Sequence, residues 1–169
     1  MSRLLYNACA SALLLGSAAL APLAQGGDLI EVKRLGMELA AELAGAAVLA
    51  CRDQGYQVAA VVVDRTGIPQ AMLRDVLASR FTIQIAEEKA NAVILSGVSS
   101  AEFRRNRGDI RAEMNHVDGI LVLEGGVPVE VGGSLVAALG VSGAPGGDKD
   151  EACARQALES QRERLEFAD

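Results

Sequence analysis

The 169-residue chain has no tryptophan and only one histidine, His116. A zinc site usually has three or four protein ligands, so His116 alone cannot build one. The three cysteines form no Cys-x-x-Cys motif, and neither a Gly-x-Gly-x-x-Gly motif nor a Ser-His-Asp order is present. These absences exclude the common signatures of zinc ribbons, dinucleotide-binding domains and serine hydrolases. An enzyme with this sequence would need a cofactor to supply its chemistry.

Basic residues are also scarce, with 16 Lys and Arg against 22 Asp and Glu and a net charge of −6. An acidic surface repels phosphate backbones and anionic membranes, which argues against a nucleic-acid partner. Half of the residues are hydrophobic, and most of these are Ala, Val and Leu. The core must therefore consist of small side chains and closely packed elements, and the length predicts one domain.

The N-terminal segment differs in composition from the rest of the chain. An apolar run covers residues 10–21, and no acidic residue occurs before Asp28. This pattern is typical of a secretory signal peptide. A membrane anchor is the alternative, but Pro22 closes a run that is short for a span of roughly 20 residues. We predict a signal peptide over 1–26, cleaved near 21–26, and a periplasmic or secreted domain over 27–169.

Periodicity along the mature chain predicts a single α+β domain. Apolar residues at helical spacing, a capping Asp and a following Gly predict helices. These helices are expected over 28–54, 79–95 and 148–167, with Asp28 and Asp148 as N-caps. Alternating or buried-looking runs bounded by turn residues predict strands. These strands are expected over 56–64, 68–76, 119–123, 127–131 and 134–142. The order implies an antiparallel five-stranded sheet with helices packed on it.

Between the second helix and the third strand lies the most polar part of the mature chain, residues 99–115. It carries four arginines together with acidic residues. We expect a short helix followed by a loop, or a lid over a site.

Removal of the leader would change the number of cysteines from three to two. Cys9 lies in the leader, so the mature protein keeps Cys51 and Cys153 in a compartment that permits disulfides. A structural disulfide, two buried inert thiols, and a catalytic thiol served by His116 are the three alternatives.

Few polar residues stand out as candidates for chemistry. His116 is either a haem ligand, for which a single histidine suffices, or a surface residue hydrogen-bonded to Asp118. Asp64 and Arg74 flank the first hairpin, and we expect them on neighbouring rungs of the ladder. There they would form an ion pair or, with Lys89, one wall of a charged site.

Several segments resemble the GlcG/HbpS-like haem-binding family. In chain order they are residues 50–56, 61–67, 71–75, 88–92, 125–129, 139–148 and 150–153. The resemblance spans nearly all of the mature chain. It implies a profilin-like fold, a homo-oligomer that is often an octamer, and, for exported members, haem binding with a role in haem or iron handling or redox sensing. It also favours a disulfide between Cys51 and Cys153.

The resemblance carries over to individual site residues. Relatives commonly have a histidine directly before the threonine of the helix with the Lys-Ala-x-x-Ala stretch, whereas here Phe81 precedes Thr82. His116 is then the one histidine left to bind haem iron, with Met, Tyr or an oxygen ligand as the other options. The candidate partners of the haem propionates are Arg74, Lys89 and Arg105. The other expected pocket residues are Asp64, Phe81, Thr82 and Glu124.

Two other functions are compatible with the same residues. One is an enzyme or enzyme accessory that acts on a small organic acid or aldehyde through Asp64, Arg74, Lys89 and Glu124. The other is a structural oligomer subunit without a cofactor. The expected partners are haem or another small ligand and further copies of the chain, with no nucleic acid and no membrane after signal removal.

Overall fold

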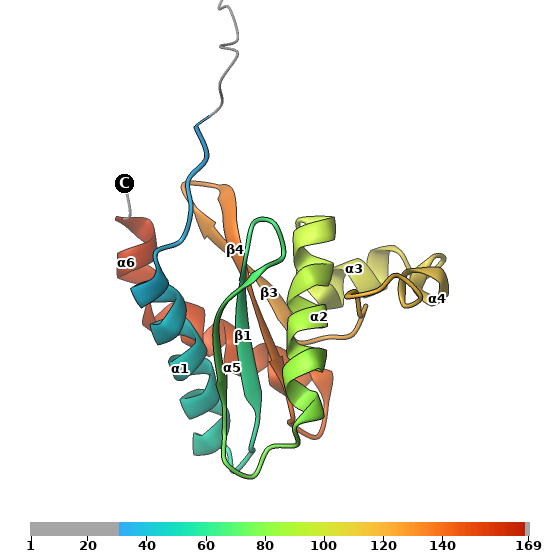
Figure 1. The fold of residues 1–169 in the computed structure, drawn as a ribbon, viewed down its shortest axis with the longest axis horizontal. Helices are drawn as coiled ribbons and strands as arrows, with labels where there is room; N and C mark the ends of the chain where they lie inside the picture. Colours follow the sequence, from blue (N-terminus) through green and yellow to red (C-terminus); the bar gives the residue numbers. More distant parts are fainter. Residues whose placement is uncertain (1–30, 168–169) are drawn as a thin grey trace, which may run out of the picture. The chain divides into compact units, whose positions relative to one another are not determined.

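The computed structural model describes residues 31–167, so the predicted signal peptide lies outside the described residues (Figure 1). The strands are β1 (Ala59–Asp64), β2 (Pro69–Arg74), β3 (Gly126–Val131) and β4 (Ser134–Ser142). The helices are α1 (Met37–Asp53), α2 (Phe81–Ser96), α3 (Ser100–Asn106), α4 (Arg111–Met114), α5 (Gly147–Ser160) and α6 (Arg162–Glu166). None of the helices in the described part is long and apolar enough to span a membrane.

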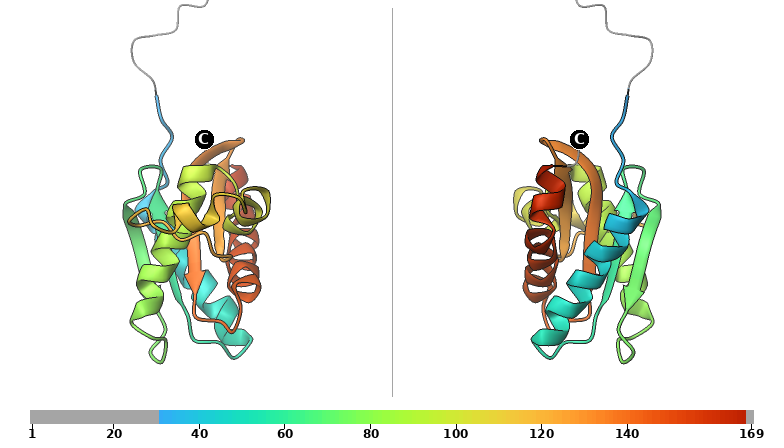
Figure 2. Two further views of the ribbon diagram at one scale, coloured as in Figure 1. Left: turned by 90° about the vertical axis from the view of Figure 1, so that its right-hand side faces the viewer. Right: turned by 90° about the vertical axis from the view of Figure 1, so that its left-hand side faces the viewer.

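The four strands form one antiparallel sheet in the order β2-β1-β4-β3. Helices α1 and α5 cover one face of this sheet and α2 covers the other, as Figures 1 and 2 show. Both predicted hairpins are present. In the second hairpin, Gly132 and Gly133 form the two-residue turn with φ values of 58° and 75°, a conformation that favours glycine. The α+β class is therefore confirmed.

The prediction of a fifth strand over residues 119–123 is wrong. This segment has no ladder partner; instead, the N–H of Leu121 donates to the carbonyl of Glu88 on α2. The N–H of Val122 donates to the side-chain oxygen of Asn115 at 2.8 Å. Val122 packs with Phe103 of α3, so the apolar run fills a small core beside α2 and does not extend the sheet.

Two predicted helix boundaries also differ from those observed. Helix α1 begins at Met37 after Gly36, and the predicted cap Asp28 lies outside the described residues. Asp148 lies in the first turn of α5 and does not cap it, because the helix already begins at Gly147. The last predicted helix is divided at Gln161 into α5 and α6.

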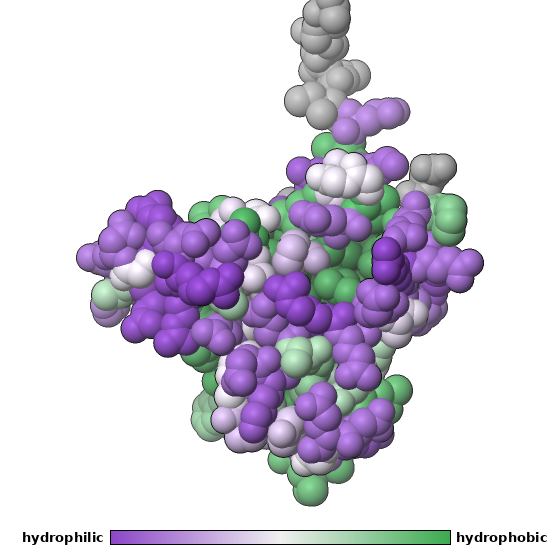
Figure 3. Space-filling model, turned by 180° about the vertical axis from the view of Figure 1, so that it is seen from behind, coloured by the Kyte–Doolittle hydropathy of each residue, from purple (hydrophilic) through white to green (hydrophobic). Residues whose placement is uncertain are grey.

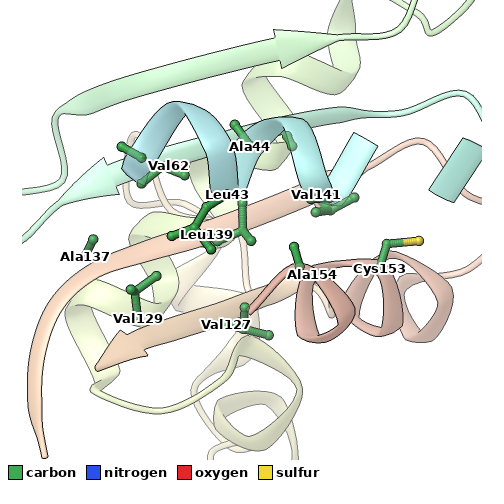
Figure 4. Close-up of a cluster of buried hydrophobic side chains, with 14 of the residues drawn as sticks. Leu43, Ala44, Val62, Val127, Val129, Ala137, Leu139, Val141, Cys153 and Ala154 are labelled. Carbon is green, nitrogen blue, oxygen red and sulfur yellow. The ribbon is translucent and has the colours of Figure 1, made fainter. Parts of the chain in front are cut away.

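The main core is built from small aliphatic side chains, as the composition predicted (Figure 4). Leu43 and Ala44 of α1 meet Val62 and Leu139 of the sheet, and all four are fully buried. Such small side chains let the layers approach closely, which is most evident where α2 crosses β3 and β4.

The disulfide between Cys51 and Cys153 is present and joins α1 to α5 inside this core. The Cα atoms are 5.3 Å apart, and 102 residues separate the two cysteines in sequence. The alternatives of two free thiols or a catalytic thiol do not hold in this structure.

Candidate functional site

An apolar hollow of about 450 Å³ lies where the C-terminal end of α2 meets α3 and α4. It is lined by Leu95, Ser96, Val98, Phe103, Asn106, Arg107, Ile110 and Met114. The region around it corresponds to the polar 99–115 stretch, and the surface of α3 and α4 is mainly hydrophilic where they project from the body of the domain (Figure 3). The apolar lining therefore contrasts with its surroundings.

The chain turns sharply to build this hollow. Gly97 ends α2 with a φ of 72°, and Ser99 caps α3 by accepting the N–H of Glu102 at 3.3 Å. The hydroxyl of Ser100 accepts the N–H of Gly126 at 2.9 Å and so attaches α3 to the start of β3. These contacts hold α3 firmly beside the sheet.

His116 does not line the hollow but follows the helix α4 that does. It is exposed in the turn that follows α4, two residues after Met114, and its backbone N–H donates to Glu113. The neighbouring Asn115 accepts the N–H of Val122, which fixes the turn against the 119–123 segment. Met114 lines the hollow, and His116 follows it by two residues without being part of the lining.

One arginine, Arg107, lines the hollow, and two more, Arg104 and Arg105, lie on α3. Arg107 donates two hydrogen bonds to Asp109, at 3.0 and 3.2 Å, and this contact raises the pKa of Arg107 and lowers that of Asp109. Arg104 lies 3.4 Å from Glu124. Arg105 is exposed on α3. All of these groups are accessible to solvent, so their ion pairs can exchange for a ligand carboxylate at little cost.

Lys89 occupies a different environment from the one predicted for a ligand-binding cation. Its side chain is 1% exposed, and its ammonium donates to Asp150 at 2.7 Å and to the carbonyl of Val141 at 3.0 Å. Burial lowers the pKa of Lys89 and raises the pKa of Asp150, against the mutual attraction of the two charges. Lys89 is thereby engaged inside the protein.

Asp64 and Arg74 do not lie on neighbouring rungs, which corrects the prediction. Arg74 is opposite Ala59, whereas Asp64 is at the far end of the hairpin, opposite Ala137 of β4. The two residues flank the hairpin in sequence, but one ends β1 at the turn and the other ends β2 at the open end. Asp64 accepts hydrogen bonds from Thr66, which lower its pKa.

Arg74, the last residue of β2, lies near the N-terminal end of α2. Its guanidinium donates to the carbonyl of Ala78 in the turn that connects β2 to α2. Phe81 begins the helix and is 57% exposed, and the buried hydroxyl of Thr82 donates to Ser79 at 2.7 Å. Helix α2 has 16 residues, so at about 1.5 Å per residue roughly 20 Å separates this end from the hollow.

The structure thus divides the predicted site residues into groups. Arg105 on α3 and His116 after α4 belong to the segment at the C-terminal end of α2, whereas Arg74, Phe81 and Thr82 lie at its N-terminal end. Lys89 and Glu124 lie between them, close enough for Glu124 to influence the pKa of Lys89.

Several lining residues were not recognised in the sequence. Phe103, Arg107, Ile110 and Met114 are spaced by four, three and four residues, which is helical spacing within a stretch that reads as polar overall. That periodicity was the signal available for the hollow. Within residues 31–167, no group of three or more His, Cys, Asp or Glu side chains is arranged to hold a metal ion.

Comparison with known proteins agrees with the resemblance found in the sequence. Residues 35–159 match the family model described as haem degrading protein HbpS-like. This is most of the chain, and the protein belongs to the HbpS-like family. No curated protein gave a significant match.

Three solved structures place the fold. A crystal structure of HbpS is 35% identical, covers 82% of this chain and 97% of its own, and has a TM-score of 0.74. A double mutant of HbpS from Streptomyces reticuli is also 35% identical, with coverage of 84% and 97% and a TM-score of 0.74. The PduOC complex with haem is 21% identical, with coverage of 76% and 95% and a TM-score of 0.68, and this similarity shows the fold alone.

Proposed function

We propose that the chain is an exported haem-binding protein of the HbpS-like family, acting as a homo-oligomer in haem or iron handling or in redox sensing. Membership of the family supports haem as the ligand, as does the haem complex of the structurally similar PduOC. The buried disulfide and the predicted signal peptide support export, because disulfides persist in oxidising compartments.

The observation that carries the proposal is the apolar hollow lined by α3 and α4, whose last lining residue, Met114, precedes His116 by two positions. Haem is a flat apolar macrocycle with two carboxylates, so its site needs apolar side chains, an axial ligand and nearby cations. Leu95, Val98 and Phe103 supply apolar surface, and Arg107 supplies a cation at the rim. The residues that line the hollow are therefore chemically suited to hold haem. Because Leu95, Asn106 and Arg107 of the lining are exposed, the proposed haem lies on the surface with one edge in solvent.

Two side chains are suited to bind the iron. His116 is the proposed axial ligand, since imidazole is the common protein ligand of haem iron. Met114 is two residues away and its thioether is the second choice. Arg105 and Arg107 are the proposed partners of the propionates, as charge-assisted donors. Lys89 is not used, because Asp150 already holds its ammonium inside the protein.

The enzyme alternative receives less support from the arrangement. Asp64 and Arg74 lie at opposite ends of the first hairpin, and Lys89 is buried, so these groups do not share one accessible pocket.

A hemin titration of the mature protein, residues 27–169, tests the proposal. We expect a saturable shift of the Soret band that His116→Ala weakens at least tenfold. Met114→Leu should change the band only if the thioether is the ligand. Met72→Leu, an exposed methionine on β2, is the matched control and should leave the titration unchanged.

Each result of the hemin titration supports a different conclusion about the ligand. Loss of binding with His116→Ala alone supports ligation by His116, and loss with Met114→Leu alone transfers the ligand to the thioether in the same hollow. Equal binding in all variants would place haem elsewhere, and the absence of a saturable shift in the wild-type protein would reject haem as the ligand.

A further inference from the structure

The two edge strands of the sheet, β3 and β2, differ in the residues that would block pairing with another chain. β3 is guarded: Pro128 has no N–H to offer, Glu130 is exposed, and charged residues of α5 and α6 lie beside both. Proline and charges on an edge strand prevent pairing with another chain. A soluble protein normally protects both of its edges in some such way.

The other edge, β2, has Pro69 at its start and Arg74 at its end, but the four residues between them, 70–73, include neither a proline nor a charge. The N–H of Asp75 donates to Val58 of the neighbouring segment at 2.9 Å. Antiparallel strands alternate between residues that face the partner and residues that face away. Leu73 therefore directs its backbone groups toward β1, whereas Met72 and Arg74 direct theirs away from the sheet. β2 lies along the outer margin of the domain in both views of Figure 2.

Apolar side chains surround this open edge. On the α1 face, Leu73 is 43% exposed and contacts Gly45; Leu49 lies one helical turn further along α1 and is 53% exposed. On the α2 face, Met72 is 50% exposed, and Phe81 at the start of α2 is 57% exposed. The strand ends and the connection to α2 add Ile68, Val76 and Leu77.

These seven side chains, each 43% to 80% exposed, provide apolar area on the scale of a standard protein interface, which removes roughly 800 Å² from each partner. Large exposed apolar patches on soluble proteins mark interaction sites. The patch also has free backbone donors and acceptors at its centre, which a strand from a partner can satisfy.

We propose that β2 pairs antiparallel with β2 of a second copy of this chain, about a two-fold axis near Met72 and Leu73, to form a continuous eight-stranded sheet. The same edge serves both copies, so each outward N–H of one strand donates to an outward C=O of the other. A pairing centred on Arg74 is disfavoured because it would bring two guanidinium groups together.

The protected β3 edge limits how far strand pairing can extend. Two edges of equal openness would allow head-to-tail growth into fibres, but Pro128 and Glu130 stop pairing at the outer strands. Pairing through β2 therefore closes at a dimer, from which larger assemblies can be built through other surfaces. This gives the proposed homo-oligomer its first interface and does not depend on haem.

Sedimentation velocity of the mature protein between about 1 and 100 µM tests the interface. We expect a dimer or an even-numbered multiple of it. Leu73→Lys and Met72→Lys each place two ammonium groups near the axis, and each should weaken the dimer about 100-fold or more. Phe167→Lys, an equally apolar and exposed position beside α6, is the control and should leave the assembly intact. Circular dichroism must show that all three variants are folded.

Single cysteines provide a second readout that does not depend on weakening the dimer. In symmetric pairing, residues at the axis have Cα atoms roughly 4.5 to 5.5 Å apart, which suits a disulfide. Either Met72→Cys or Leu73→Cys should therefore give a cross-linked dimer under mild oxidation, and Phe167→Cys should not.

The inference is overturned by a wild-type protein that stays monomeric, or by an oligomer that survives both lysine variants without cross-linking at 72 or 73. A wild-type chain that stays monomeric and binds a peptide of another protein along β2 would also overturn it. Hemin titration of the same samples keeps the two proposals apart, since a monomer that binds hemin rejects the interface alone, and a β2 dimer that does not bind hemin rejects the ligand alone.

Discussion

The ammonium of Lys89 lies 2.7 Å from the carboxylate of Asp150, and both side chains are almost completely buried. Lys89 belongs to α2 on one face of the sheet and Asp150 to α5 on the other. Their contact passes Gly125, the residue before β3, where an added Cβ would lie 2.8 Å from the lysine nitrogen. The second oxygen of Asp150 accepts the N–H of Ala144, so the pair also fixes the loop before α5.

Breaking this pair should be strongly destabilising. Lys89→Met leaves the Asp150 carboxylate buried without its cation, and removal of one partner from a buried pair costs about 3–5 kcal/mol. The double variant with Asp150→Asn should recover part of this loss, because no buried charge then remains. Urea unfolding of the two single variants and the double variant measures the coupling. Lys149→Met, a more exposed neighbour on α5, is the control, and additive single effects would contradict a direct pair.

The approach of α2 to the sheet depends on two glycines. An added Cβ at Gly140 would fall on the carbonyl oxygen of Ala86, and one at Gly126 on the carbonyl oxygen of Lys89. Gly140→Ala should therefore force α2 away from β4 and lower the free energy of unfolding by about 3 kcal/mol. Gly108→Ala, where the nearest atom is 3.6 Å from the added Cβ, should change it by less than about 0.5 kcal/mol. Equal unfolding midpoints for the two variants would show that the close contact is not needed.

Local pattern was sufficient to predict most of the fold. Strand patterns and turn residues identified both hairpins, with Gly67 in the first turn and Gly132-Gly133 in the second, and the apolar spacing identified α1 and α2. The run over 119–123 has the composition of a strand, but its hydrogen-bond partners are Glu88 of α2 and the side chain of Asn115, and hydrophobic pattern reveals neither contact.

The candidate site was predicted less well for a related reason. Residues that flank a hairpin in sequence look adjacent, yet Asp64 and Arg74 belong to opposite ends of it. The lining of the hollow was hidden by the many charges of residues 99–115, although Phe103 and Met114 kept helical spacing. Burial of Lys89 depends on the glycines that let α2 approach the sheet, which only the assembled structure reveals.

The disulfide should contribute substantially to stability. It joins residues 102 positions apart, and a closed loop of that length restricts the unfolded chain enough to contribute about 2–5 kcal/mol. The Cys51→Ala/Cys153→Ala double variant should accordingly unfold at lower urea concentration than the oxidised protein. Reduced wild-type protein should unfold near the double variant. If all three share one midpoint, the bridge does not stabilise the fold.

The Arg52–Asp75 pair should make stability depend on pH in the acidic range. Arg52 donates to both oxygens of Asp75, at 2.8 and 3.0 Å, and this contact is the main cause that lowers the pKa of Asp75 below its ordinary value of 3.8. The unfolded state then binds more protons as the pH falls through this range. The stabilisation is therefore complete above the ordinary pKa and is lost as the pH falls through the folded-state pKa.

Asp75→Asn removes this contribution, so the wild-type protein should exceed the variant in stability by a constant amount from pH 7 to about pH 5. The difference should shrink as the pH falls further. Urea midpoints measured between pH 7 and pH 2.5 give the comparison, with the exposed neighbour Asp53→Asn as the control. A difference that persists unchanged at pH 2.5 would mean that Asp75 acts through the shape of its hydrogen bonds, including the one from the N–H of Val76, and not through its charge.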